Sequence, residues 1–268
     1  MPARIIDVHS HLGCSIHRAM SADGARLCAL AGTAGITHSI CFSLEACSGS
    51  LDLGNRYTLS EVEKYPELSA LLVVHPYHRE ASLRWIAEAA THPKVLGIKI
   101  HPNLGNYDVL SRGMIDLLEN HIAPAGLPVL SHVTNDSPTV TIASYLKLAA
   151  RFPGIHFVAA HLGIGVFGPG DTAIEAWSQH PLDNVWFDMG TLRAFVNGAV
   201  ETLLTTVGPH RLCFGTDSPL YTPAPFVRLL ETLDVDDETR ENIAWRNALN
   251  AFPRLALNPL SNVSEPGV

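Results

Sequence analysis

The 268-residue sequence lacks the features that mark secreted, membrane-spanning or disulfide-rich proteins. Its five cysteines form no C-x-x-C pair, so neither a disulfide framework nor a redox motif is expected. No uncharged apolar run reaches the ~18 residues that a bilayer-spanning helix needs. No basic segment followed by an apolar one precedes the first predicted strand, so no signal peptide is expected. These absences predict a cytoplasmic protein with no membrane partner.

Basic residues are also fewer than acidic ones, 18 against 26, which gives a formal net charge of −8. Proteins that bind a phosphate backbone usually present a basic surface, so nucleic acid is not an expected partner. No Gly-x-Gly-x-x-Gly follows the first predicted strand and no Walker-type phosphate loop is present, which argues against a nucleotide cofactor. The composition therefore favours a small-molecule substrate.

Short apolar runs alternate with longer amphipathic segments along the whole chain. This alternation predicts a parallel sheet covered by helices, and eight such units favour one closed (β/α)₈ barrel of the TIM type. We expect this α/β domain to span residues 1–257 and residues 258–268 to form a loosely held tail. The predicted strands are residues 5–9, 39–43, 70–75, 95–101, 128–132, 156–161, 185–189 and 211–217, and the predicted helices are residues 22–34, 81–90, 112–122, 139–151, 171–178, 194–206, 225–233 and 237–252.

Histidine or aspartate ends several of these strands. Side chains alternate along a strand, so His9 and His11 point the same way at the carboxyl end of the first one. His132, His161 and Asp217 end the fifth, sixth and eighth strands, and barrel enzymes build their sites at this end. A hydrolytic metal site needs a few neutral imidazoles, a carboxylate and an open position for water. We therefore predict that His9, His11, His132 and Asp217 bind one divalent metal ion.

A bound divalent metal lowers the pKa of its water from about 16 to about 7, which supplies hydroxide at neutral pH. Asp217 is predicted to take the proton of that water, and His161 to act as acid–base or to stabilise negative charge on the substrate. Imidazole and carboxylate ligands suit zinc, manganese, iron or cobalt. Eight further histidines are expected to be surface or core residues, and these are His17, His38, His78, His92, His121, His156, His180 and His210.

The loops that follow the strands are expected to supply the substrate-binding residues. We predict that role for Lys99, His101, Tyr107, Asn135 and Arg193. His101 would hydrogen-bond the substrate or serve as a structural histidine. Arg193 would pair with a substrate carboxylate or face solvent.

Taken together, these motifs resemble the amidohydrolase superfamily. The resemblance is strongest to the amidohydrolase-2 branch, which includes aminocarboxymuconate-semialdehyde decarboxylase and related decarboxylases, hydratases and lactone hydrolases. TatD-like nucleases resemble the chain less, because they carry a glutamate on the fourth strand where Lys99 stands here. The matching segments are DVHSH at 7–11, GIKIHP at 97–102, SH at 131–132, AHLG at 160–163, FGTDSP at 214–219 and the closing stretch 242–252.

The resemblance implies a distorted (β/α)₈ barrel with one divalent metal, usually zinc, and a homodimer. It assigns His9, His11, His132 and Asp217 as metal ligands and His161 as the catalytic histidine. In binuclear members of the superfamily a lysine of the fourth strand bridges two metals. Lys99 therefore leaves a two-metal site as the alternative to the one-metal site that we favour.

The primary hypothesis for function is hydrolysis of a C–N or C–O bond in a small cyclic amide, lactone or ester by a metal-activated water. The alternative is non-oxidative decarboxylation of an unsaturated or aromatic carboxylic acid, which requires a cation near the substrate carboxylate. A third hypothesis, a non-catalytic barrel stabilised by metal, is disfavoured because every key position carries a suitable residue.

Overall fold

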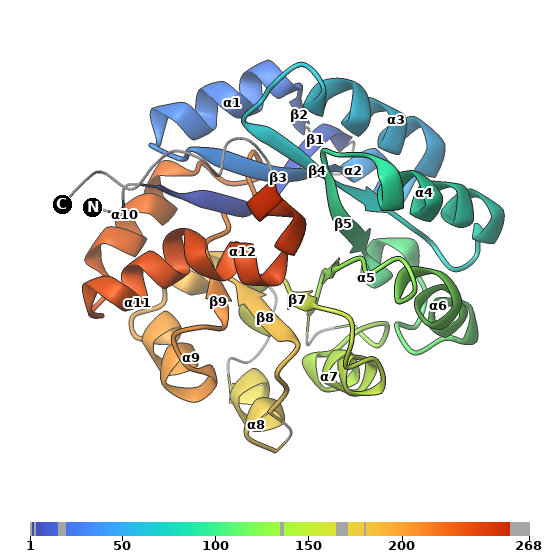
Figure 1. Ribbon diagram of the computed structural model, residues 1–268. Coiled ribbons are helices and arrows are strands. Elements are labelled where there is room, and N and C mark those ends of the chain that lie inside the picture. The colour runs from blue at the N-terminus through green and yellow to red at the C-terminus, as the bar shows by residue number, and fades with distance from the viewer. Residues whose placement is uncertain are drawn as a thin grey trace.

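Within the residues that the structure describes, nine strands form one curled sheet, and helices cover its outer face (Figure 1). The computed structural model describes residues 2, 4–15, 20–134, 137–164, 171–179 and 181–257. Eight strands pair in parallel in chain order, and β2 joins β1 in an antiparallel hairpin, so the predicted α/β barrel is confirmed. The strands are β1 (Ile6–Ser15), β2 (Met20–Ala22), β3 (His38–Ser43), β4 (Leu68–Val73), β5 (Val95–Ile100), β6 (Val129–Ser131), β7 (Phe157–Ala159), β8 (Val185–Asp188) and β9 (Leu212–Cys213).

The helices lie between successive strands and shield the sheet from water (Figure 1). In the described part of the chain, none is long and apolar enough to cross a membrane. The α-helices are α1 (Gly24–Thr33), α2 (Leu44–Ser48), α3 (Leu51–Val62), α4 (Arg79–Thr91), α5 (Pro102–Gly105), α6 (Arg112–Leu117), α7 (Ile142–Arg151), α8 (Asp171–Gln179), α9 (Ala199–Val207), α10 (Ala224–Thr232), α11 (Asp237–Glu241) and α12 (Asn247–Ala251). Shorter or wider helical turns are η1 (Leu118–Ile122), η2 (His161–Gly163), η3 (Leu192–Phe195), η4 (Asn242–Arg246) and η5 (Pro253–Leu257).

The apolar side chains form two clusters, as expected for a sheet covered on both faces. The larger cluster joins the strands to the surrounding helices. The smaller one joins alternate strand residues, among them Val8, Phe42 and Val158, to Phe252 at the end of α12. Because strand side chains alternate between faces, this second cluster fills the barrel interior, and α12 lies across one end of the barrel (Figure 1).

The barrel closes where the chain beyond β9 returns to β1. Val8 N–H donates to the carbonyl of Phe214 at 3.0 Å, and Asp217 N–H donates to the carbonyl of His9 at 2.8 Å. These bonds continue the parallel ladder past the end of β9. Closure therefore places the side chains that follow β9 next to those at the carboxyl end of β1.

The buried carboxylate of Asp7 reinforces this closure. Its Oδ1 accepts the backbone N–H groups of His9 and Thr216 at 3.0 and 3.1 Å. Its Oδ2 accepts the hydroxyls of Ser10 and Thr216 at 2.8 and 2.5 Å. One side chain thus holds β1 and the segment after β9 at a fixed separation, immediately beside the predicted metal ligands.

Several strands end earlier than predicted. β6, β7 and β9 stop at Ser131, Ala159 and Cys213. His161 and Asp217 therefore lie in turns, where their φ angles of 62° and 59° are left-handed. Such angles rarely occur within regular strands, so the chemically important side chains leave the ladder as they reach the barrel mouth.

The sequence prediction also missed β2 and α3, for a reason visible in α3. Its buried face carries Asn55 and Thr58 instead of an apolar stripe. The Asn55 side chain exchanges two 2.9 Å hydrogen bonds with the backbone of Val73 on β4. A helix is predicted from apolar residues at helical spacing. In α3, polar residues that hydrogen-bond to the backbone of the sheet take some of those positions, so the pattern is not visible in the sequence.

His38 on β3 makes stability depend on pH. Its Nε2 lies 3.0 Å from Ser69 Oγ, and burial lowers its pKa to about 4. The unfolded chain binds the proton near pH 6.5, so stability is lost as the pH falls below that value. We expect this residue to remove about 2 kcal/mol of unfolding free energy between pH 7 and pH 5.

Urea unfolding of the wild type and of His38→Gln at both pH values measures this contribution. The variant should lose less stability than the wild type on acidification. The matched control is His78→Gln, since His78 is exposed at the start of α4 and should leave the wild-type pH dependence intact. Equal losses in the wild type and in His38→Gln would contradict the prediction.

Candidate functional site

Two imidazoles and a carboxylate meet at the barrel mouth. Oδ1 of Asp217 lies 2.6 Å from Nε2 of His11 and 3.3 Å from Nε2 of His9. The side chains come from β1 and from the turn after β9, and all three residues are buried. Their ligand atoms lie within 4.8 Å of one another, which is close enough to share one ion.

Asp188, at the end of β8, fixes the tautomer of His9. Its Oδ2 lies 2.8 Å from Nδ1 of His9. Burial opposes ionisation of Asp188, but the neighbouring His9 and His161 outweigh it and lower the pKa of this carboxyl. An ionised carboxylate only accepts hydrogen bonds, so Nδ1 of His9 carries the proton and Nε2 presents a lone pair.

The lone pair of His9 and the carboxylate of Asp217 face each other across 3.3 Å. Burial lowers the pKa of His9 to about 4 and also lowers that of His11, so both imidazoles are neutral at neutral pH. Burial raises the pKa of Asp217, but the hydrogen bond with His11 and the neighbouring imidazoles outweigh burial and lower it. Two acceptors facing each other in a buried site are stabilised by a cation between them. The three residues therefore fit a divalent metal ion.

His161 lies beside this cluster in the turn after β7. Its backbone N–H donates to Oδ1 of Asp188 at 3.0 Å, and its Nδ1 lies 2.6 Å from the carbonyl of Gly190. A carbonyl can only accept, so Nδ1 of His161 bears a proton. The His161 ring lies 4.9 Å from the ring of His9, so the imidazole reaches the metal cluster.

His132 is held between two other imidazoles. Its Nδ1 lies 3.0 Å from Nε2 of His161, and its ring stacks on that of His101 at 4.2 Å. Burial, followed by the charge of the neighbouring histidines, lowers the pKa of His132 well below its usual value. Nε2 of His161 can accept a hydrogen bond from Nδ1 of His132, and that arrangement would leave a lone pair on Nε2 of His132.

The ligand atoms close enough to share an ion form two overlapping sets in the described residues. One set is His9, His11 and Asp217, and the other is His9, His161 and Asp188. His132 belongs to neither set, so its role as a metal ligand stays a prediction. Asp188 was not identified as a site residue from the sequence. Asp188 is the last polar residue of a predicted strand, the same position that identified His132, His161 and Asp217, so it could have been found in the same way.

Lys99 provides a buried positive charge next to these groups. Its side chain is fully enclosed, and Nζ lies 4.3 Å above the ring of Phe42. Burial lowers its pKa to about 8, partly opposed by Cys47 and Asp188, so the amine is mostly protonated at neutral pH. A charged amine here favours an anionic substrate group near the cluster.

The other predicted substrate-binding residues lie in different settings. Tyr107 is buried, and its hydroxyl accepts the backbone N–H of His101 at 3.1 Å, so it positions the histidine. Arg193 is half-buried in η3, and its guanidinium makes no ion pair with the residues that the structure describes. Asn135 lies outside the described residues.

The family model described as amidohydrolase matches residues 45–254. A search of curated proteins finds no match. The matched segment includes Lys99, His132, His161, Asp188 and Asp217 but begins after β1.

Solved structures with the same fold include three enzymes at low sequence identity. A 5-carboxyvanillate decarboxylase from Novosphingobium aromaticivorans, with manganese and 4-hydroxy-3-methoxy-5-nitrobenzoic acid bound, has a TM-score of 0.71 at 16% identity over 93% of this chain and 96% of that chain. A 2,6-dihydroxybenzoate decarboxylase from Rhizobium has a TM-score of 0.71 at 14% identity over 94% and 99%. A probable 2-pyrone-4,6-dicarboxylic acid hydrolase from Acinetobacter baumannii, with citric acid bound, has a TM-score of 0.71 at 14% identity over 93% and 99%.

Asp188→Asn tests whether this carboxylate controls the His9 tautomer. Oδ1 of Asp188 accepts the backbone N–H groups of His161 and Gly190, so an asparagine oxygen should stay there. Its NH₂ group would then face Nδ1 of His9 and move the proton to Nε2. We expect metal affinity to fall by about 10–100-fold, as for other residues that orient metal-binding histidines.

A competition titration against a chromogenic chelator measures the affinity, and thermal unfolding of the metal-free protein checks that the fold is intact. Asp183→Asn is the matched control, because Asp183 is fully exposed just before β8 and pairs with Arg211. Unchanged affinity in Asp188→Asn would contradict the assignment.

Proposed function

Because the chain belongs to the amidohydrolase family and is a metal-dependent enzyme of that family, we propose that it decarboxylates an aromatic or unsaturated carboxylic acid without an oxidant. The observation that carries the proposal is Lys99, a buried ammonium beside the imidazole–carboxylate cluster. It would supply the cation that decarboxylation requires near the substrate carboxylate. The decarboxylases among the structures that share this fold add support.

His9, His11 and Asp217 are the residues proposed to hold the metal, with His132 as a further ligand. Nitrogen and carboxylate ligands suit manganese and zinc alike, and the manganese of a similar decarboxylase makes it the first ion to try. When bound, the ion would supply positive charge beside the substrate carboxylate and any neighbouring hydroxyl. Asp188 would keep the lone pair of His9 directed at that position.

In the proposed reaction, the bond between the carboxylate and its carbon breaks, CO₂ leaves and the same carbon takes up one proton. Lys99 would orient the carboxylate by charge. His161 is the proposed proton donor, because its imidazole lies beside His9 and is held through Nδ1 by the carbonyl of Gly190. It would take up a second proton on Nε2 and pass that proton to the carbon as CO₂ leaves. The burial of these residues keeps bulk water away from the carbon while the proton is transferred.

The comparisons favour this reaction over the hydrolysis that the sequence placed first. Hydrolysis of a lactone or cyclic amide has the support of one similar structure, the probable pyrone dicarboxylic acid hydrolase. The same cluster could direct a water at a carbonyl, so hydrolysis is the competing outcome of the experiment below.

Decarboxylation is tested by loading the purified protein with manganese or zinc and incubating it with 2,6-dihydroxybenzoate, 5-carboxyvanillate and related hydroxybenzoates. We expect CO₂ release that a chelator abolishes and added metal restores. His161→Ala should slow turnover by about 10²–10⁴-fold, which is the usual worth of a general acid. Opening of 2-pyrone-4,6-dicarboxylate without CO₂ release from any acid would instead establish the hydrolase.

Lys99→Met tests the role of the buried cation. We expect kcat/KM for the carboxylic acid to fall by about 100-fold, in line with the loss of a charged hydrogen bond in a buried site. Lys99→Arg keeps the charge and should retain more activity than Lys99→Met. Wild-type activity should fall as the pH rises through about 8, because the amine then loses its proton. A wild-type rate in Lys99→Met with unchanged metal content would exclude this role.

A further inference from the structure

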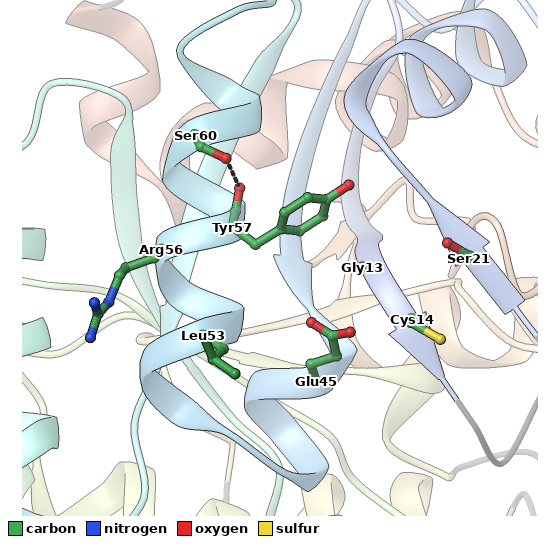
Figure 2. Close-up of a pocket in the computed structure, with 8 residues that line it drawn as sticks. All are labelled: Gly13, Cys14, Ser21, Glu45, Leu53, Arg56, Tyr57 and Ser60. Atoms are coloured by element: carbon green, nitrogen blue, oxygen red, sulfur yellow. Dashed lines mark hydrogen bonds between the residues drawn. The ribbon is translucent and has the colours of Figure 1, made fainter.

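A groove opens between α3 and the β1–β2 hairpin (Figure 2). It has a volume of about 530 Å³. Gly13 lies two residues beyond His11 on β1, which is about 7 Å along a strand. β1 therefore runs from the metal ligands into the lining of the groove. Its lining includes Gly13, Cys14, Ser21, Glu45, Leu53 and Tyr57.

Glu45 places a carboxylate in this groove. In Figure 2 the side chain lies below Tyr57 and Gly13, with its carboxylate directed toward them. A Cβ atom at position 13 would lie 3.5 Å from Oε2 of Glu45 and 3.2 Å from Oγ of Ser43, so a glycine at this position leaves the space open. Glu45 is half-buried, and within the described residues its carboxylate has no hydrogen-bond or ion-pair partner. Its acceptor capacity is therefore available to a ligand.

The rest of the groove is apolar or neutral. The ring of Tyr57 forms one wall, and Leu53 is 65% exposed at the edge. Arg56, the other charged residue among those that line the groove, points away from Glu45 in Figure 2. The guanidinium of Arg56 is 3.7 Å from Asp52. The charge presented inside the groove by the described residues is therefore negative.

We propose that this groove binds the end of the substrate remote from the reacting carboxylate and selects a group that donates hydrogen bonds, an amine above all, on an aromatic body. A carboxylate can only accept hydrogen bonds, so Glu45 favours a donor and rejects a second acid. The Tyr57 ring offers an apolar and aromatic contact for the body of the substrate and for a cation. The assignment of the groove to the substrate rests on the proposed function, whereas its preference for a donor rests on Glu45.

The preference is measured with two acids of the same shape. The amine of para-(aminomethyl)benzoate replaces the methyl group of para-ethylbenzoate. Calorimetric titration of the metal-loaded protein should show the amine binding about tenfold more tightly, which is the effect of one charged hydrogen bond. Glu45→Gln should remove most of that difference. Glu88→Gln, an exposed acid on α4, should leave it unchanged.

Cys14 gives a second readout at the groove itself. It is exposed, whereas Cys41, Cys47 and Cys213 are buried and Cys28 is half-buried. A chromogenic disulfide should therefore label Cys14 first, and Cys14→Ser should abolish the fast phase. We expect para-(aminomethyl)benzoate to slow this phase in the wild type and in Glu88→Gln, and to do so much less in Glu45→Gln.

The outcomes separate this inference from the proposed function. CO₂ release without a preference for the amine would keep the decarboxylase and overturn the groove assignment. A preference lost in Glu45→Gln, in a protein that releases no CO₂, would support the groove and overturn the decarboxylase. Equal binding of the two acids, binding of neither, or an unchanged preference in Glu45→Gln would overturn the inference.

Discussion

The site depends on one closure, at which the chain beyond β9 hydrogen-bonds to β1 and completes the barrel. The carboxylate of Asp7 holds both segments through four hydrogen bonds, and two of its donors belong to Thr216, next to Asp217. His9 and Asp217 are more than 200 residues apart in sequence, yet their ligand atoms lie 3.3 Å apart. The sheet holds these ligand atoms close together, so they would not have to move to bind a metal ion.

The charges around the centre compensate one another inside an apolar barrel. Asp188 and Asp217 remain ionised despite burial because imidazoles neighbour both of them. Lys99 adds a positive charge at a position where a lysine would otherwise be costly to bury. A divalent cation together with one anionic ligand would bring the sum of these three charges to zero, which is the charge balance that the proposed function requires.

The sequence was sufficient to predict the barrel and the meeting of His9, His11 and Asp217. Alternation along a strand and the shared carboxyl end of parallel strands are properties of any such sheet. The sequence was not sufficient to predict the orientation of the His132 imidazole, because that orientation depends on a hydrogen bond with His161. The groove also escaped prediction, because α3 and β2 were not recognised and both supply its walls.

The left-handed backbone at His161 and Asp217 sets the chemistry of this barrel against its stability. Such an angle costs a residue with a side chain about 1–3 kcal/mol, least for asparagine, aspartate and histidine, and glycine would relieve it. Glycine offers neither an imidazole nor a carboxylate. Selection for heat resistance alone would therefore favour such replacements at both turns. The resulting protein would be more stable and would lack both functional side chains.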